Sequence, residues 1–172
     1  AWMTEGEKIE VPEGLSAREW LAQYYFEHYS KEYDVDLASF CTRSEIMDSI
    51  LYSLFPNLAP WAGFHPNLTY RMKPYGDNHE MCTMEIIFLM RYPDGAERPA
   101  DAPVHKLDKD QLFSEAPGLE GGIGRVFDQD FSNLKMVQKG LKNLKSKEVV
   151  LANYQEIRIR HFHQTLDKYL NA

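Results

Sequence analysis

Three consecutive residues of types that can do chemistry, Asp128, Gln129 and Asp130, follow the glycine-rich stretch "GLEGGIG" at 118–124. Downstream of them the chain takes on the apolar periodicity of a helix. A carboxylate at such a place can cap the helix, act as a general base or bind a metal ion. Spacing along the helix helps to decide which role each aspartate takes.

The helix that must position these aspartates is predicted over about residues 128–144, with an apolar stripe at intervals of three and four that we expect to be buried. Its members are Leu134, Val137, Leu141 and Leu144. Counting back one turn from Leu134 leads to Asp130, whereas Asp128 is in line with the polar face. We therefore predict that Asp128 is the N-cap of this helix and that Asp130 heads its apolar face.

A carboxylate on an apolar face is costly unless it is hydrogen-bonded, paired with a cation or bound to a metal. Asp130 can accept hydrogen bonds from amides of the first turn, or pair with a buried arginine or histidine. Alternatively, it can be a metal ligand or a general base. Asn133 lies one turn further on and can share whatever Asp130 faces.

The six histidines supply no close pair of metal ligands. His161 and His163 are two residues apart in a helical segment, so their rings point about 200° apart. We expect one of them to pack or hydrogen-bond inside and the other to be solvated. The glycine-rich stretch has no preceding parallel strand, so it is a weak signal for a dinucleotide site.

The remaining elements follow from capping signals and hydrophobic period. Ser16 with Glu19, and Thr42 with Glu45, are capping boxes that predict helices over about 17–33 and from 42 to about 55. Alternation then predicts strands. The expected strands are 67–73 and 81–93, joined by a turn at 74–80 as a hairpin, with a third strand within 54–64. Residues 93–118 are expected as a surface connection, and a last helix at about 153–170. The result is an α+β fold, interpreted as a single domain over residues 1–172.

Composition excludes several classes of protein. The net charge of −7 without a basic tract argues against a nucleic-acid partner. The longest apolar run, around "IIFLM", is too short to span a membrane. Two widely spaced cysteines and no recognisable secretory signal predict a cytoplasmic location.

Two stretches near the C-terminus, "VFDQDFSNLKMVQKGL" and "LANYQEIRIRHFHQTLDKYL", resemble the end of the alpha subunits of Rieske-type non-haem iron oxygenases, which hydroxylate aromatic rings. "LFPNLAPWAGFHPNLTYRMKPYGDNHE" and "APVHKLDKDQLFSEAPGLEG" are similar to the preceding part of the same catalytic domain. The likeness covers about residues 7–170. It implies a helix-grip architecture, in which an antiparallel sheet folds around a long C-terminal helix.

Residue by residue, the resemblance implies that Asp130 is the carboxylate ligand of a catalytic Fe(II) and that Asn133 lies beside it. Phe127 and Phe131 are then expected to border the substrate pocket, with ordinary core packing as the alternative. The family's two histidine ligands and the cysteine–histidine pairs of its [2Fe-2S] cluster have no match here. The chain is therefore interpreted as the C-terminal part of the catalytic domain, without the Rieske domain and not competent by itself.

For the parent enzyme, the resemblance implies O2-dependent hydroxylation of an aromatic or other apolar substrate, a ferredoxin and reductase as electron donors, and a trimer-type homo-oligomer. Two alternatives stay open for the chain alone. One is a stand-alone helix-grip module that binds a hydrophobic small molecule without metal. The other is an assembly module whose acidic surface forms an interface.

Overall fold

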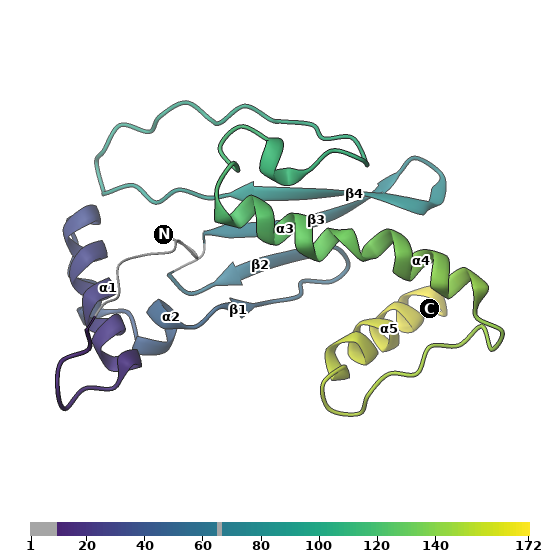
Figure 1. Ribbon diagram of the computed structural model, residues 1–172, viewed down its shortest axis with the longest axis horizontal. Coiled ribbons are helices and arrows are strands. Elements are labelled where there is room, and N and C mark those ends of the chain that lie inside the picture. Colours follow the sequence, from purple (N-terminus) through teal and green to yellow (C-terminus); the bar gives the residue numbers. More distant parts are fainter. Residues whose placement is uncertain (1–9, 65–66) are drawn as a thin grey trace. The chain divides into compact units, whose positions relative to one another are not determined.

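The computed structural model describes residues 10–64 and 67–172 (Figure 1). The chain forms two compact units, one of residues 10–99 and one whose described part is residues 100–172. The architecture is α+β. The first unit contains a four-stranded antiparallel sheet, and the described part of the second unit contains three α-helices. This confirms the predicted fold class, whereas the single-domain interpretation stays a prediction.

Helix α1, Ala17–Tyr33, begins where the capping box predicts. The Glu19 amide donates to Ser16 Oγ at 3.2 Å, and the Ser16 amide donates to Glu19 Oε2 at 3.1 Å. Two of the four amides that the first turn of a helix leaves unpaired are thereby satisfied. The helix ends at Asp34, whose backbone is left-handed with φ of 52°.

Helix α2, Arg43–Met47, has the second predicted capping box but is far shorter than predicted. After Asp48 the backbone is extended, and Ile50–Leu51 form strand β1. The apolar run from 46 to 55 suits either a helix or a strand. Strand pairing decides between them, because β1 forms an antiparallel ladder with the strand of residues 58–62.

The sheet has the order β1-β2-β3-β4, with β2 at Leu58–Ala62, β3 at Leu68–Tyr75 and β4 at Asn78–Phe88. The predicted hairpin is confirmed, with its turn at Gly76 and Asp77, and the predicted third strand is β2. One face of the hairpin is apolar and the other carries charge. The apolar face comprises Leu68, Tyr70, Met72, Met84, Ile86 and Phe88. On the charged face Glu85 forms ion pairs with Arg71 and Lys73.

The core of the first unit lies where α1 and α2 meet the loop after β2. Phe64 is 6% exposed and packs near Tyr29, with 5.1 Å between ring centroids. Arg91 lies over the Phe64 ring at 4.5 Å and donates to the Gly63 carbonyl at 3.1 Å. This cation therefore ties the chain after β4 to the loop after β2.

Tyr29 packs against this core, and its partial burial makes its contribution to stability depend on pH. Burial, together with the neighbouring Tyr25 and Tyr33, raises the pKa of Tyr29 to about 12. The folded state therefore holds the phenolic proton more tightly than the unfolded state. We expect the free energy of unfolding to be unaffected by this group below pH 10 and to fall between about pH 10 and 12. Tyr29→Phe should flatten that alkaline decrease in urea titrations, whereas Tyr75→Phe, at the exposed hairpin tip, should leave it unchanged.

The second unit contains a short 3-10 helix η2, Phe113–Glu115, and helices α3, Gly122–Ser132, α4, Leu134–Asn143, and α5, Ile157–Leu170. The helix predicted over 128–144 therefore begins at Gly122 and has an irregular turn at Asn133. The helix predicted over 153–170 begins at Ile157. Within the described ranges no helix is both long and apolar enough to cross a membrane.

Candidate functional site

The predicted cap position of Asp128 is wrong. Helix α3 begins at Gly122 with Gly121 as its N-cap, so Asp128 lies in its second turn. Glycine is a poor helix former, and the sequence pattern therefore favoured a start after the glycine-rich stretch. Packing overrides that preference, because the backbone of α3 at Gly124 lies too close to the segment 112–119 for a residue with a Cβ.

One face of α3 packs on that segment, and its members are spaced as one helical stripe. They are Gly124, Phe127, Asp128 and Phe131. A Cβ added to Gly124 would lie 2.1 Å from the Leu119 carbonyl oxygen and 2.9 Å from Ser114 Cα. Both are backbone atoms that cannot rotate away, so only glycine allows this approach.

The two phenylalanines of this face contact a third ring on η2. Phe127 is 2% exposed, and its ring lies edge-on to Phe113 with 5.6 Å between centroids. Phe131 makes a similar contact at 4.8 Å. In the described chain both rings thus take part in local packing. That they line a substrate pocket stays a prediction.

Asp128 makes the directional contacts of the packed face. Its Oδ1 accepts a hydrogen bond from the Phe113 amide at 2.6 Å, and its Oδ2 accepts one from the Ser114 amide at 3.3 Å. Burial raises the pKa of this carboxyl, but the hydrogen bonds from Ser114 and Phe113 outweigh it and leave the pKa below its ordinary value. Asp128 is therefore a cap, but of η2 rather than of its own helix.

Asp130 is exposed, and it lies roughly 110° around α3 from the centre of the packed face at 100° per residue. Among residues 10–64 and 67–172 no hydrogen bond or ion pair of its carboxylate is observed. Asn133, also exposed, forms the turn between α3 and α4, and its carbonyl accepts from the Val137 amide at 2.9 Å. Asp128 therefore accepts hydrogen bonds through both carboxylate oxygens, whereas the Asp130 carboxylate accepts none in the described chain.

The prediction that the apolar stripe from Leu134 onward is buried is wrong. Leu134, Val137 and Leu141 are 54%, 54% and 44% exposed. Periodicity identifies the apolar face of a helix but does not show which segment packs against it. Nothing in the described chain covers this stripe, so Asp130 and Asn133 are accessible at its start.

The described chain does not bring metal ligands together. In residues 10–64 and 67–172 there is no group of three His, Cys, Asp or Glu side chains that could hold a metal ion. Both His161 and His163 are exposed on α5, so the prediction that one of them is buried is wrong. The described residues therefore do not form a complete metal centre by themselves, and Asp130 as one ligand of such a centre stays a prediction.

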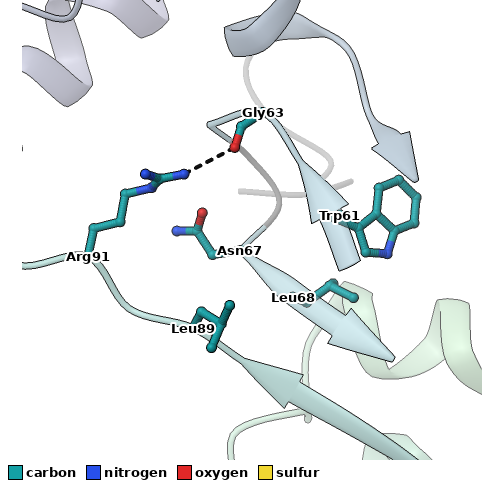
Figure 2. Close-up of a pocket in the computed structure, with 6 residues that line it drawn as sticks. All are labelled: Trp61, Gly63, Asn67, Leu68, Leu89 and Arg91. Atoms are coloured by element: carbon teal, nitrogen blue, oxygen red, sulfur yellow. Dashed lines mark hydrogen bonds between the residues drawn. The ribbon is translucent and has the colours of Figure 1, made fainter. Parts of the chain in front are cut away.

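A pocket that the sequence did not indicate lies in the first unit, where β2 ends, β3 begins and the chain leaves β4 (Figure 2). Its volume is about 210 Å³, and it is lined by Trp61, Gly63, Asn67, Leu68, Leu89 and Arg91. The buried indole N–H of Trp61 has no hydrogen-bond partner in the described part of the chain. Only the strand register, which places Asn67 beside Leu89, would have revealed this grouping from sequence.

A protein-family model described as the ring hydroxylating alpha subunit (catalytic domain) matches residues 7–172, nearly the whole chain. No curated protein and no solved structure matches the chain.

Proposed function

Because the chain belongs to the catalytic-domain family of ring-hydroxylating alpha subunits, we propose that it supplies the carboxylate ligand of an oxygenase iron centre. The ligand is Asp130, with Asn133 beside it. Two histidines and one carboxylate hold Fe(II) in this type of centre and leave positions open for O2. When bound, the iron supplies the activation of O2 for hydroxylation.

The observation that supports Asp130 is the contrast with Asp128. Both oxygens of Asp128 accept backbone hydrogen bonds, so coordination of a metal by Asp128 would leave the Phe113 and Ser114 amides without their partner. Asp130 is exposed and unpaired in the described chain, and it can bind a cation without giving up any contact. Oxygen ligands of this type suit hard or borderline divalent metals.

The chain alone does not complete this centre. The two histidine ligands and the [2Fe-2S] cluster belong to a longer alpha subunit in this proposal, together with O2, an aromatic or other apolar substrate, and a ferredoxin and reductase as electron donors. The parent enzyme in this proposal is a trimer-type homo-oligomer and is located in the cytoplasm. Phe127 and Phe131 would act mainly by placing α3 next to the substrate.

The alternative of a stand-alone module for a hydrophobic small molecule has less support. The pocket of the first unit has a volume of about 210 Å³, below the roughly 300–1,000 Å³ of typical small-molecule sites. Two of its lining side chains, Asn67 and Arg91, are polar. This pocket is therefore too small to enclose an apolar ligand of substantial size.

Asp130→Asn should remove the iron from the full-length subunit and abolish hydroxylation, because a neutral amide is a poor iron ligand. The full-length subunit is identified by sequencing the gene upstream of residue 1. The upstream sequence is searched for the two histidine ligands and for the cysteine–histidine pairs. Iron content is then measured by elemental analysis of purified protein. Asp167→Asn, an exposed carboxylate on α5, is the matched control and should retain iron. Full iron content and turnover in Asp130→Asn would refute the assignment.

A further inference from the structure

Helix α3 is held against residues 112–119 by contacts of different kinds. The phenylalanine rings contribute apolar packing, which is not directional and tolerates small rotations of the helix about its axis. The Asp128 carboxylate instead accepts from two successive amides, at 2.6 and 3.3 Å. Hydrogen bonds weaken steeply as their geometry departs from linear, so this pair restricts both rotation and sliding of α3.

Rotation of α3 matters for the carboxylate on its other side. Asp130 follows Asp128 by two residues, so the two side chains point about 200° apart on one rigid helix. A carboxylate roughly 6 Å from the helix axis moves about 2 Å when the helix turns by about 20°. Metal–ligand distances must hold to about 0.2 Å, so a freely rotating helix would spoil a ligand at that position.

We propose that Asp128 is a positioning residue, which clamps α3 to the Phe113 and Ser114 amides and thereby sets the direction of the Asp130 carboxylate. Gly124 allows the close approach that the clamp needs, since a Cβ there would meet backbone. The inference rests on the proposed function of Asp130 as a ligand. It assigns to Asp128 a role through α3, without contact between Asp128 and the metal.

Two variants separate hydrogen bonding from charge. Asp128→Ala removes both acceptors, whereas Asp128→Asn keeps one carboxamide oxygen that can accept the Phe113 amide and removes the negative charge. The first readout is hydrogen exchange of the Phe113 and Ser114 amides, followed by NMR in the 172-residue chain. We expect faster exchange at both amides in Asp128→Ala and near wild-type protection of Phe113 in Asp128→Asn. Unchanged exchange in Asp128→Ala would refute the clamp.

The second readout is the binding of Mn(II) alone, a carboxylate-seeking probe that broadens nearby amide signals. Broadening centred on residues 129–134 should disappear in Asp130→Asn and stay in Asp167→Asn. In Asp128→Ala we expect the affinity measured by this broadening to fall roughly tenfold, the lower end for loss of a group that orients a ligand. Asp128→Asn should retain most of it.

The possible outcomes separate the two hypotheses. Equal weakening by Asp128→Ala and Asp128→Asn would show that the charge of Asp128 matters, which overturns the positioning role. No weakening in Asp128→Ala overturns it as well. If the wild-type chain shows no broadening around Asp130, that carboxylate does not hold a metal ion by itself and the ligand assignment is decided by Asp130→Asn in the full-length subunit, while the exchange experiment still decides whether Asp128 clamps α3.

Discussion

Gly124→Ala is expected to lower the free energy of unfolding by about 3 kcal/mol, the upper end of the usual cost of overpacking. The added methyl would lie 2.1 Å from the Leu119 carbonyl oxygen and 2.9 Å from Ser114 Cα. Relief requires α3 to move away from residues 112–119, and this weakens the Asp128 hydrogen bonds and the contacts of Phe127. Most core side chains can adjust by changing rotamer, but these obstructing atoms are backbone.

Urea unfolding followed by circular dichroism measures this effect, and Gly140→Ala is the matched control. Gly140 is in α4, and a Cβ added there meets nothing within 4 Å. The same substitution should therefore stabilise the protein at residue 140 by about 0.5–1 kcal/mol, through helix propensity. Opposite signs at the two glycines would show that packing decides. A stabilising or neutral Gly124→Ala would contradict the close contact of α3 with residues 112–119.

Local signals predicted the starts of α1 and α2 because a capping box is complete within four residues. Ser16 with Glu19 and Thr42 with Glu45 form the expected hydrogen bonds. The extent of α2 was not predictable in the same way. The apolar residues after Asp48 can continue a helix or enter a sheet, and the choice depends on β2, which follows later in the chain.

The same distinction between local and distant information applies to the candidate site. Helical spacing set Asp130 apart from Asp128, but it put Asp128 on the polar face, whereas Asp128 is half-buried against η2 and Asp130 is exposed. It could not show that Asp128 caps η2, because the amides of Phe113 and Ser114 are 15 and 14 residues away in sequence. Nor could it show that the stripe from Leu134 onward is exposed, because exposure depends on which segments fold against it.

Phe127→Ala should lower the free energy of unfolding by about 3–4 kcal/mol, because a buried phenylalanine leaves a cavity when it is truncated. The side chain is 2% exposed and contacts Phe113, which lies at the start of η2. Leu134→Ala, on the exposed stripe one turn beyond Asp130, is the control and should change stability by less than about 1 kcal/mol.

Chemical denaturation of both variants also distinguishes the two roles considered for Phe127. A ring that lines an open substrate pocket has solvent on one side, so its truncation should cost far less than the value expected for a packed ring. A loss of about 3–4 kcal/mol in the free energy of unfolding would assign Phe127 to the contact between α3 and η2. That contact lies on a different face of α3 from Asp130. A loss below about 1 kcal/mol would instead favour a place at the pocket wall. The size of this one free-energy change therefore decides whether substrate specificity should be sought at Phe127 or at residues on the Asp130 side of α3.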